Sequence, residues 1–126
     1  MTILALVFLG LAAAIHVFIF WLESVVWTTP RARKVFDTTP ESAASTRQLA
    51  YNQGFYNLFL AIGAVASVVA TASGFRPVAL ALACASAGSM VAAALVLAAS
   101  DRTKLRPALI QGVPPAVGLL ALLLAG

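Results

Sequence analysis

Charged residues are scarce in this sequence. Asp, Glu, Lys and Arg together make up 10% of its 126 residues, whereas they make up roughly a quarter of a soluble domain. Hydrophobic residues reach 62%, which leaves too little polar surface for a soluble protein of this size. The chain is therefore expected to lie in a lipid bilayer. Because a membrane span needs about 20 apolar residues, this length allows four helices in one domain, residues 1–126, and little else.

Cysteine and histidine are almost absent, with one residue of each. Cys84 lies within an apolar run and has no partner for an intrachain disulfide, so it is expected to be a small packing residue. One His and one Cys cannot fill a metal coordination shell within one chain, so we expect no metal and no cofactor. Haem held between the His16 side chains of two copies stays open as an alternative.

The sequence also lacks a nucleophile elbow, a phosphate-binding loop and a redox CxxC motif. No Lys or Arg precedes Arg31. The first apolar segment thus lacks the basic start of a signal peptide and is expected to remain as a membrane span.

The net charge of +4 comes from basic residues in short segments between apolar runs. Such residues set membrane orientation more often than they bind nucleic acid, so no nucleic-acid partner is expected. Seven of the eight Lys and Arg residues lie in the first and third connections, and only Arg76 lies in the second. The positive-inside rule therefore predicts a multi-pass protein of the bacterial inner membrane with both termini on the outer side.

Four apolar runs predict an all-α, four-helix integral membrane bundle with helices over about residues 2–27, 41–72, 77–100 and 107–125. The loops are short except for one longer, basic connection between the first two helices, expected on the cytoplasmic side. That connection contains Thr-Thr-Pro twice. It can form a short interfacial helix between two turns, or a plain solvated loop.

Small residues predict where the helices touch. Gly63 and Ser67, four apart in the second helix, permit a close helix contact. The third helix carries small residues on two neighbouring faces, which can serve partners inside the chain or in a homo-oligomer. These faces are Cys84, Gly88 and Ala92, and Ala85, Ser89 and Ala93.

The end of the first helix carries polar residues at helical spacing. His16, Glu23 and Trp27, together with Phe20, recur at intervals of four, three and four, which places them on one stripe of a continuous helix. Trp27 also fits the aromatic belt at a membrane surface. His16 lies about 10 Å deeper than Glu23, where ionisable side chains usually face a bundle interior or a cavity.

Polar side chains return at the start of the second helix, where Asn52, Gln53, Tyr56 and Asn57 bring three amides and a phenol into an apolar run. Unpaired polar groups are costly in lipid, so they must face protein, water or a ligand. Gly54, among them, lets another backbone approach closely. The stretch predicts one wall of a polar pocket.

The fourth helix carries Gln111 just before Pro114-Pro115. Each proline removes a hydrogen bond to the carbonyl four residues earlier, which frees two carbonyls and predicts a kink. The kink can serve a cavity or merely shape the packing.

These segments all fall at the same predicted end of the bundle, so their polar groups can line one pocket open to the cytoplasm. The alternative is a purely structural clasp that holds the helices in register. Glu23 is expected to contact Asn52, Asn57 or Gln111, because a carboxylate at this depth needs donors. The candidate binding residues are His16, Glu23, Trp27, Asn52, Gln53, Tyr56, Asn57 and Gln111.

In order, these motifs resemble a bacterial membrane family known as domain of unknown function 1304. The resemblance is carried by His16 with residues 18–23 and Trp27, by residues 52–57 followed by Phe-Leu-Ala, and by Gln-Gly-Val-Pro at residues 111–114. Pro115 stands where the family usually has Ala. The resemblance implies a four-helix inner-membrane protein and no established activity.

Three functions fit these observations. One is a small-solute transporter or permease acting as a homo-oligomer, in which one acid exchanges a proton against a solute. The second is a membrane enzyme acting on a lipid or isoprenoid by acid/base chemistry between His16 and Glu23. The third is a non-catalytic subunit that binds membrane lipids or stabilises a partner.

Overall fold

The structure is a computed structural model that describes all residues, 1–126. Its elements are helical throughout, and four of the helical segments are long and apolar enough to cross a membrane. The predicted all-α, four-helix membrane bundle is therefore confirmed. The elements in order are α1 (Thr2–Phe20), the π-helical turn η1 (Trp21–Val25), α2 (Pro30–Phe36), α3 (Pro40–Ser45), α4 (Arg47–Ala72), α5 (Arg76–Ser100), the 3-10 turn η2 (Arg102–Lys104) and α6 (Leu105–Leu124).

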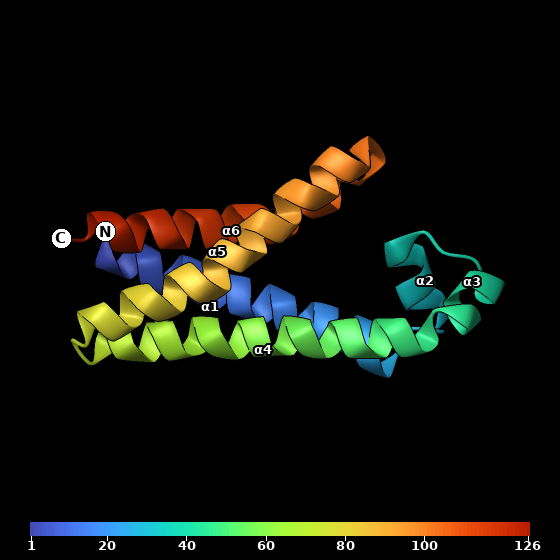
Figure 1. Ribbon diagram of the computed structural model, residues 1–126, viewed down its shortest axis with the longest axis horizontal. Helices are drawn as coiled ribbons and strands as arrows, with labels where there is room; N and C mark the ends of the chain where they lie inside the picture. The colour runs from blue at the N-terminus through green and yellow to red at the C-terminus, as the bar shows by residue number, and fades with distance from the viewer.

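The four long helices form a ring in which α1 packs on α4, α4 on α5, α5 on α6 and α6 on α1. Both chain termini lie at one end of this ring, and α2 and α3 lie beyond the other end (Figure 1). We call these the termini end and the basic end, since the connections at the basic end carry seven of the eight Lys and Arg residues.

The bundle is closed at the termini end. Gly118 of α6 lies against α1 so closely that an added Cβ would come within 2.9 Å of the backbone nitrogen of Leu9. Arg76 Nη2 donates to the carbonyl oxygens of Leu122 (3.4 Å) and Leu123 (3.5 Å), near the end of α6. Carbonyls in the last turn of a helix lack their usual partners four residues on. The Leu122 carbonyl also accepts from the N–H of Ala125 (3.3 Å), and the single basic residue at this end adds a donor to both carbonyls.

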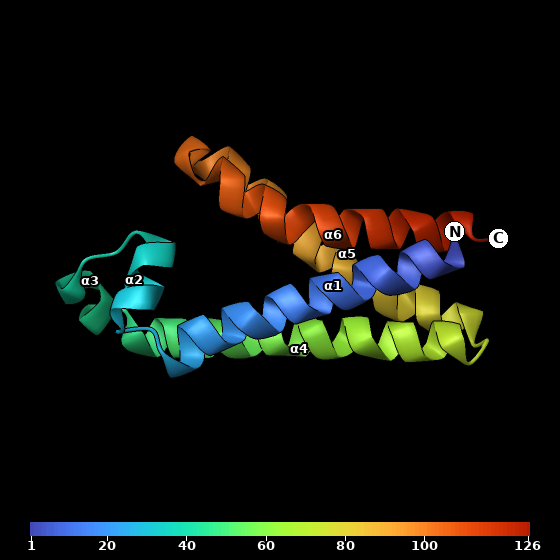
Figure 2. The same cartoon turned by 180° about the vertical axis from the view of Figure 1, so that it is seen from behind.

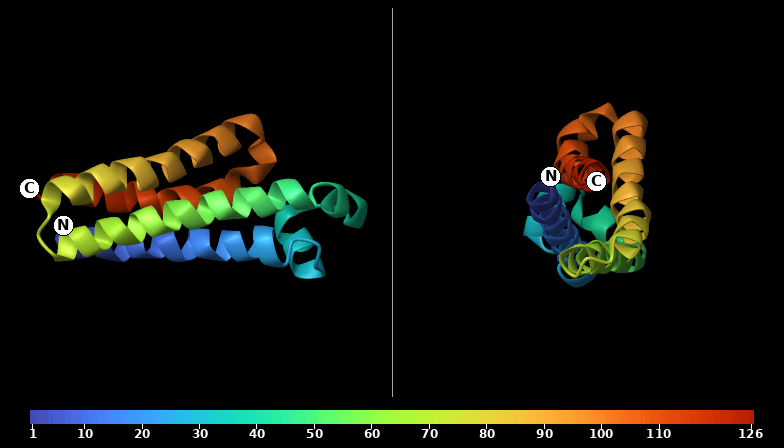
Figure 3. Two further views of the ribbon diagram at one scale, coloured as in Figure 1. Left: turned by 60° about the horizontal axis from the view of Figure 1, so that its bottom comes forward. Right: turned by 90° about the vertical axis from the view of Figure 1, so that its left-hand side faces the viewer.

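Toward the basic end the helices separate into two pairs. Figures 1 and 2 show the α5–α6 hairpin diverging from α1 and α4 in this direction, and the two views of Figure 3 show the ring from the side and along its length. α6 stays helical through Pro114 and Pro115 but changes direction along its length (Figure 2). The predicted kink is therefore a bend in a continuous helix, and both prolines are buried.

Small residues bring α4 and α5 together, as predicted for Gly63 and Ser67. A Cβ on Gly63 would lie 2.9 Å from the Cβ of Ser86. Ser67 Oγ donates to the carbonyl oxygen of Ala79 over 2.8 Å. Both contacts depend on the absence of a larger side chain.

The two predicted small-residue faces of α5 do not pack inside the chain. α5 faces the bundle with Ala79, Ala83 and Ala87, which are fully buried. Cys84 is exposed and does not pack inside the chain, whereas packing against a second copy stays a prediction. The outward strip consists of Cys84, Ala85, Gly88, Ser89, Ala92 and Ala93, of which Gly88 is the least exposed.

The connection at the basic end contains two short helices, α2 and α3, rather than one. Thr29 and Thr39 cap them by accepting hydrogen bonds from the backbone N–H groups of Ala32 (3.4 Å) and Ser42 (3.1 Å), and a proline follows each cap. Each Thr-Thr-Pro thus starts a helix. Thr46 separates α3 from α4, so the helix predicted over residues 41–72 is in fact two helices.

The first span ends earlier than predicted, at Val25 instead of residue 27. In η1 the N–H of Val26 bonds to the carbonyl oxygen of Trp21 (3.1 Å), which adds one residue to the turn. Trp27 therefore does not continue the helical stripe. Its indole Nε1 donates to the carbonyl oxygen of Ala43 (3.1 Å) and to Thr46 Oγ1 (3.3 Å), and its ring lies 4.9 Å from that of Phe36.

Candidate binding site at the basic end

The end of α1 and the start of α4 touch at Ser24 and Gly54. A Cβ on Gly54 would collide with the Ser24 side chain and lie 3.0 Å from its backbone nitrogen. Ser24 Oγ donates to the carbonyl oxygen of Tyr51 over 2.8 Å. Gly54 therefore provides the close approach that the sequence predicts. Because α1 and α4 are so close at Ser24, the preceding residue of α1's extension, Glu23, can reach the side chains of α4.

Glu23 and Asn57 meet across this contact. Asn57 Nδ2 donates to Glu23 Oε2 over 2.8 Å and also to the backbone carbonyl of Gln53 over 3.1 Å. The two hydrogens of this amide are thus both used, which fixes its orientation. The predicted contact between Glu23 and one of three amide residues is confirmed, with Asn57 as the partner.

The half-buried Glu23 carboxylate borders a small hollow. Its volume is about 120 Å³, room for about four water molecules at roughly 30 Å³ each. Glu23 Oε1 has no hydrogen-bond partner in the protein, so it is free to accept a bond from a water or a solute. The hollow is lined by Glu23, Ser24, Val25, Trp27, Thr28, Arg47 and Tyr51.

Aromatic side chains flank this contact between α1 and α4. The rings of Phe20 and Phe55 meet edge to face with centroids 5.2 Å apart, and the rings of Tyr51 and Phe55 lie 5.0 Å apart. Glu23 and Asn57 are both partly buried at this contact, and a hydrogen bond is stronger where water has less access.

His16 does not join this site. It is buried, and because a carbonyl oxygen can only accept, its Nδ1 donates to Ala12 (2.8 Å). None of the five main hollows reaches it. Its acceptor residue, Ala12, belongs to an apolar core cluster with Ala13, Ala61, Ala64 and Met90. The structure therefore does not show a path between His16 and Glu23.

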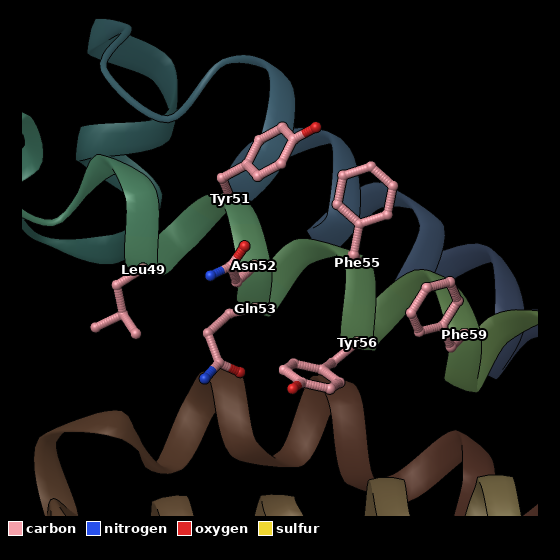
Figure 4. Close-up of a pocket in the computed structure, with 7 residues that line it drawn as sticks. All are labelled: Leu49, Tyr51, Asn52, Gln53, Phe55, Tyr56 and Phe59. Carbon is pink, nitrogen blue, oxygen red and sulfur yellow. The ribbon is translucent and has the colours of Figure 1, made fainter.

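The other predicted residues are divided between two places. Asn52, Gln53 and Tyr56 are exposed and line a separate hollow on α4, with Tyr51, Phe55 and Phe59 on its other side (Figure 4). Gln111, on α6, is partly buried and makes no hydrogen bond to any of them. A single pocket containing all eight residues is not what the structure shows. The separation of α6 from α4 at this end accounts for the difference.

Five residues of the Glu23 hollow are not among the sequence candidates: Ser24, Val25, Thr28, Arg47 and Tyr51. Ser24 and Tyr51 are next to the predicted residues Glu23 and Asn52 in the chain, so the sequence does point to this part of the hollow. The sequence places Arg47 only near the basic connection. Whether Arg47 reaches the hollow depends on where α4 begins. α4 begins at Arg47, whereas the helix predicted from the sequence begins several residues earlier, at residue 41.

Comparison with protein families gives one match. A sequence model described as "Protein of unknown function (DUF1304)" matches residues 10–123. The chain belongs to this family. No curated protein and no solved structure matches it. The matched region of this DUF1304 protein contains every candidate residue from His16 to Gln111.

Proposed function

We propose that this DUF1304 protein is a small-solute transporter or permease of the bacterial inner membrane that works as a homo-oligomer. The solute site is the hollow beside Glu23. By the positive-inside rule the basic end faces the cytoplasm, so the hollow lies at the cytoplasmic side of the membrane.

The observation that carries the proposal is the state of the Glu23 carboxylate. One oxygen is held by Asn57, and the other has no partner and borders a hollow of about 120 Å³. An acid within a membrane span is costly and usually marks an ion or solute site. A small organic cation such as guanidinium can donate to the free oxygen, and protonation of the acid would release it. The two events together exchange one cation for one proton.

The arrangement of the helices supports the same proposal. The two hairpins are held together at the termini end by the close contact of Gly118 in α6 with Leu9 in α1, and they diverge at the basic end (Figure 2). Rocking of one hairpin against the other is a known way to expose a site to each side in turn. The bend in α6 near Pro114-Pro115 is a position where such motion could be absorbed.

The outward strip of α5 supports assembly of more than one copy. A Cβ added at Gly88 would meet no heavy atom within 4 Å, so this part of the helix is open to a second helix. Small residues at such a position allow close helix packing in lipid.

One observation favours a second candidate, the structural clasp. The direct hydrogen bond between Asn57 and Glu23 joins α1 to α4, as a clasp would. The enzyme hypothesis has less support, because it depends on proton exchange between His16 and Glu23 and no main hollow connects them.

The experiment compares Glu23→Gln with Glu41→Gln, which removes an exposed acid of α3 that does not line the hollow. Each protein is reconstituted into liposomes that contain a fluorescent pH indicator, and guanidinium or methylammonium is added outside. We expect cation-driven proton efflux with the wild type and Glu41→Gln, and at least a tenfold loss with Glu23→Gln. Equal flux in all three proteins, or no flux in the wild type, would contradict the proposal. A Glu23→Gln protein that fails to fold would favour the clasp.

A further inference from the structure

Three hollows follow one another along the outer face of α4. The first lies beside Arg47, Gln48 and Tyr51 and has a volume of about 400 Å³. The second, of about 750 Å³, shares Tyr51 with the first. The third, of about 350 Å³, shares Tyr56 and Phe59 with the second and lies on the seam between α4 and α5. Neighbouring hollows share wall residues, and we call the three together the α4 groove.

The chemistry of this groove changes in one direction. Its outer part holds Arg47 and Gln48, and its middle part holds the amides of Asn52 and Gln53. Its inner part is apolar apart from the hydroxyls of Tyr56 and Ser86 and is lined by residues such as Leu60, Gly63, Leu82 and Ala85. No acidic residue lines any of the three hollows, so the groove carries one positive charge, at its outer end.

The depth of each part follows from helix geometry. α4 has 26 residues and is about 39 Å long at 1.5 Å per residue. This exceeds the roughly 30 Å hydrocarbon thickness, so its first turn reaches the headgroup region. Asn52 lies about 7.5 Å deeper than Arg47, and Phe59 about 18 Å deeper. The charged part is therefore at headgroup depth, the amides are near the hydrocarbon boundary and the apolar part is within the hydrocarbon.

The amides in the middle part need a partner. The side chains of Asn52 and Gln53 and the hydroxyl of Tyr56 make no hydrogen bond within the protein, and Figure 4 shows Asn52 between the two sides of the groove. Exposed amides at the edge of hydrocarbon are costly unless something bonds to them.

We propose that this groove binds one anionic phospholipid, with its phosphate at Arg47 and Gln48, its ester carbonyls at Asn52 and Gln53, and an acyl chain along the α4–α5 seam. The order of phosphate, esters and chain is the order of the three hollows. Ester carbonyls accept the hydrogen bonds that the two amides have to give. The outer part of the groove shares Arg47 and Tyr51 with the Glu23 hollow, whereas its amide and acyl-chain parts extend away from that hollow along α4. Lipid binding in the groove does not depend on the proposed transport function.

The test is native mass spectrometry of the full chain in detergent after delipidation, with added phosphatidylglycerol or phosphatidylcholine of identical acyl chains. We expect the wild type to retain one phosphatidylglycerol per chain, with at least fivefold tighter binding than phosphatidylcholine. Arg47→Gln should remove this preference, since one basic residue near a membrane surface is worth a factor of about five. Arg102→Gln, which changes a basic residue outside the groove, should leave it unchanged.

Two further variants test the deeper parts of the groove. Asn52→Leu removes an amide, and Ala85→Phe fills the seam, so both should weaken the binding of either lipid at least fivefold. Ala93→Phe is the matched control for Ala85→Phe, because both residues are exposed in the same strip of α5 but only Ala85 lines the groove. If Ala85→Phe does not fold, Asn52→Leu decides the question.

Equal retention of the two lipids by the wild type, or unchanged retention in Arg47→Gln and Asn52→Leu, would overturn the proposal. The proposal would also be overturned if the wild type formed a lipid-free dimer and the groove variants dissociated it, since a second copy would then cover α4. Glu23→Gln should still bind phosphatidylglycerol, because Glu23 does not line the groove. The transport proposal and the lipid proposal can therefore fail independently of each other.

Discussion

Asn57 donates a hydrogen bond to Glu23 over 2.8 Å, although the two residues lie 34 positions apart in the chain. The bond joins the end of the first span to the second span near the basic end of the bundle. A carboxylate at this position has lost part of its contact with water, so each donor matters to it. The same bond leaves one carboxylate oxygen free, which makes the pair suitable for both holding the helices and binding a solute.

The first prediction concerns this bond. Asn57→Leu keeps a similar volume but leaves the carboxylate of Glu23 without its donor, which should lower the free energy of unfolding by about 1–3 kcal/mol. Removing both polar partners, in Glu23→Leu/Asn57→Leu, should be less destabilising than Asn57→Leu because no polar group is left unpaired. Reversible unfolding in detergent measures both effects. A double variant less stable than Asn57→Leu would show that the pair does not interact as described.

The second prediction concerns the close approach of α1 and α4. Gly54→Ala should destabilise the protein by about 1–3 kcal/mol, because the added methyl group must displace Ser24 and the backbone next to it. Gly10→Ala is the matched control: nothing lies within 4 Å of the added Cβ, and alanine favours a helix. Thermal unfolding should show a lower transition temperature for Gly54→Ala only. An unchanged transition temperature for Gly54→Ala would mean that α1 and α4 lie farther apart at this point than they do in the structure.

Much of this fold follows from local sequence. The long apolar runs define four helices, the two Thr-Thr-Pro segments start α2 and α3, and Gly54 and Gly63 mark two close helix contacts. Each of these features depends on neighbouring residues in the chain, where sequence patterns are informative. The Glu23–Asn57 contact could also be foreseen as one of three possibilities, because the first and second spans are antiparallel neighbours.

Other features depend on how whole helices pack and are not visible in a local pattern. The divergence of α5 and α6 from α4 leaves Gln111 apart from the amides of α4, and it exposes Gln53 and Tyr56. The π-helical turn changes the spacing after Phe20, so a stripe extrapolated at ideal helical geometry misplaces Trp27. His16 satisfies its Nδ1 within its own helix, a bond available to any histidine at this position.

The third prediction follows from the position of Trp27. Trp27→Phe keeps an aromatic ring near Phe36 but removes the indole donor to Ala43 and Thr46, which should loosen the connection at the basic end. Trypsin should then cleave after Arg33 or Lys34 several times faster in detergent solution. Trp21→Phe is the control, because the indole of Trp21 makes no hydrogen bond in the structure, and a phenyl ring can still lie against Phe18 (5.9 Å between centroids) and the Arg31 guanidinium (5.8 Å). Equal cleavage of the two variants would mean that the Trp27 hydrogen bonds do not hold the connection.

The last prediction concerns orientation in the membrane, which rests on the seven-to-one division of the basic residues between the two ends. Ser45 is exposed at the basic end and Ser73 at the termini end, so a cysteine at either position is open to labelling. Both substitutions are made in a Cys84→Ala background, since the natural cysteine is itself exposed. In intact bacterial spheroplasts, a membrane-impermeant maleimide should label Ser73→Cys, and it should label Ser45→Cys only after lysis. The opposite pattern would place the Glu23 hollow on the outer side, and the proposed direction of solute entry would have to be reversed.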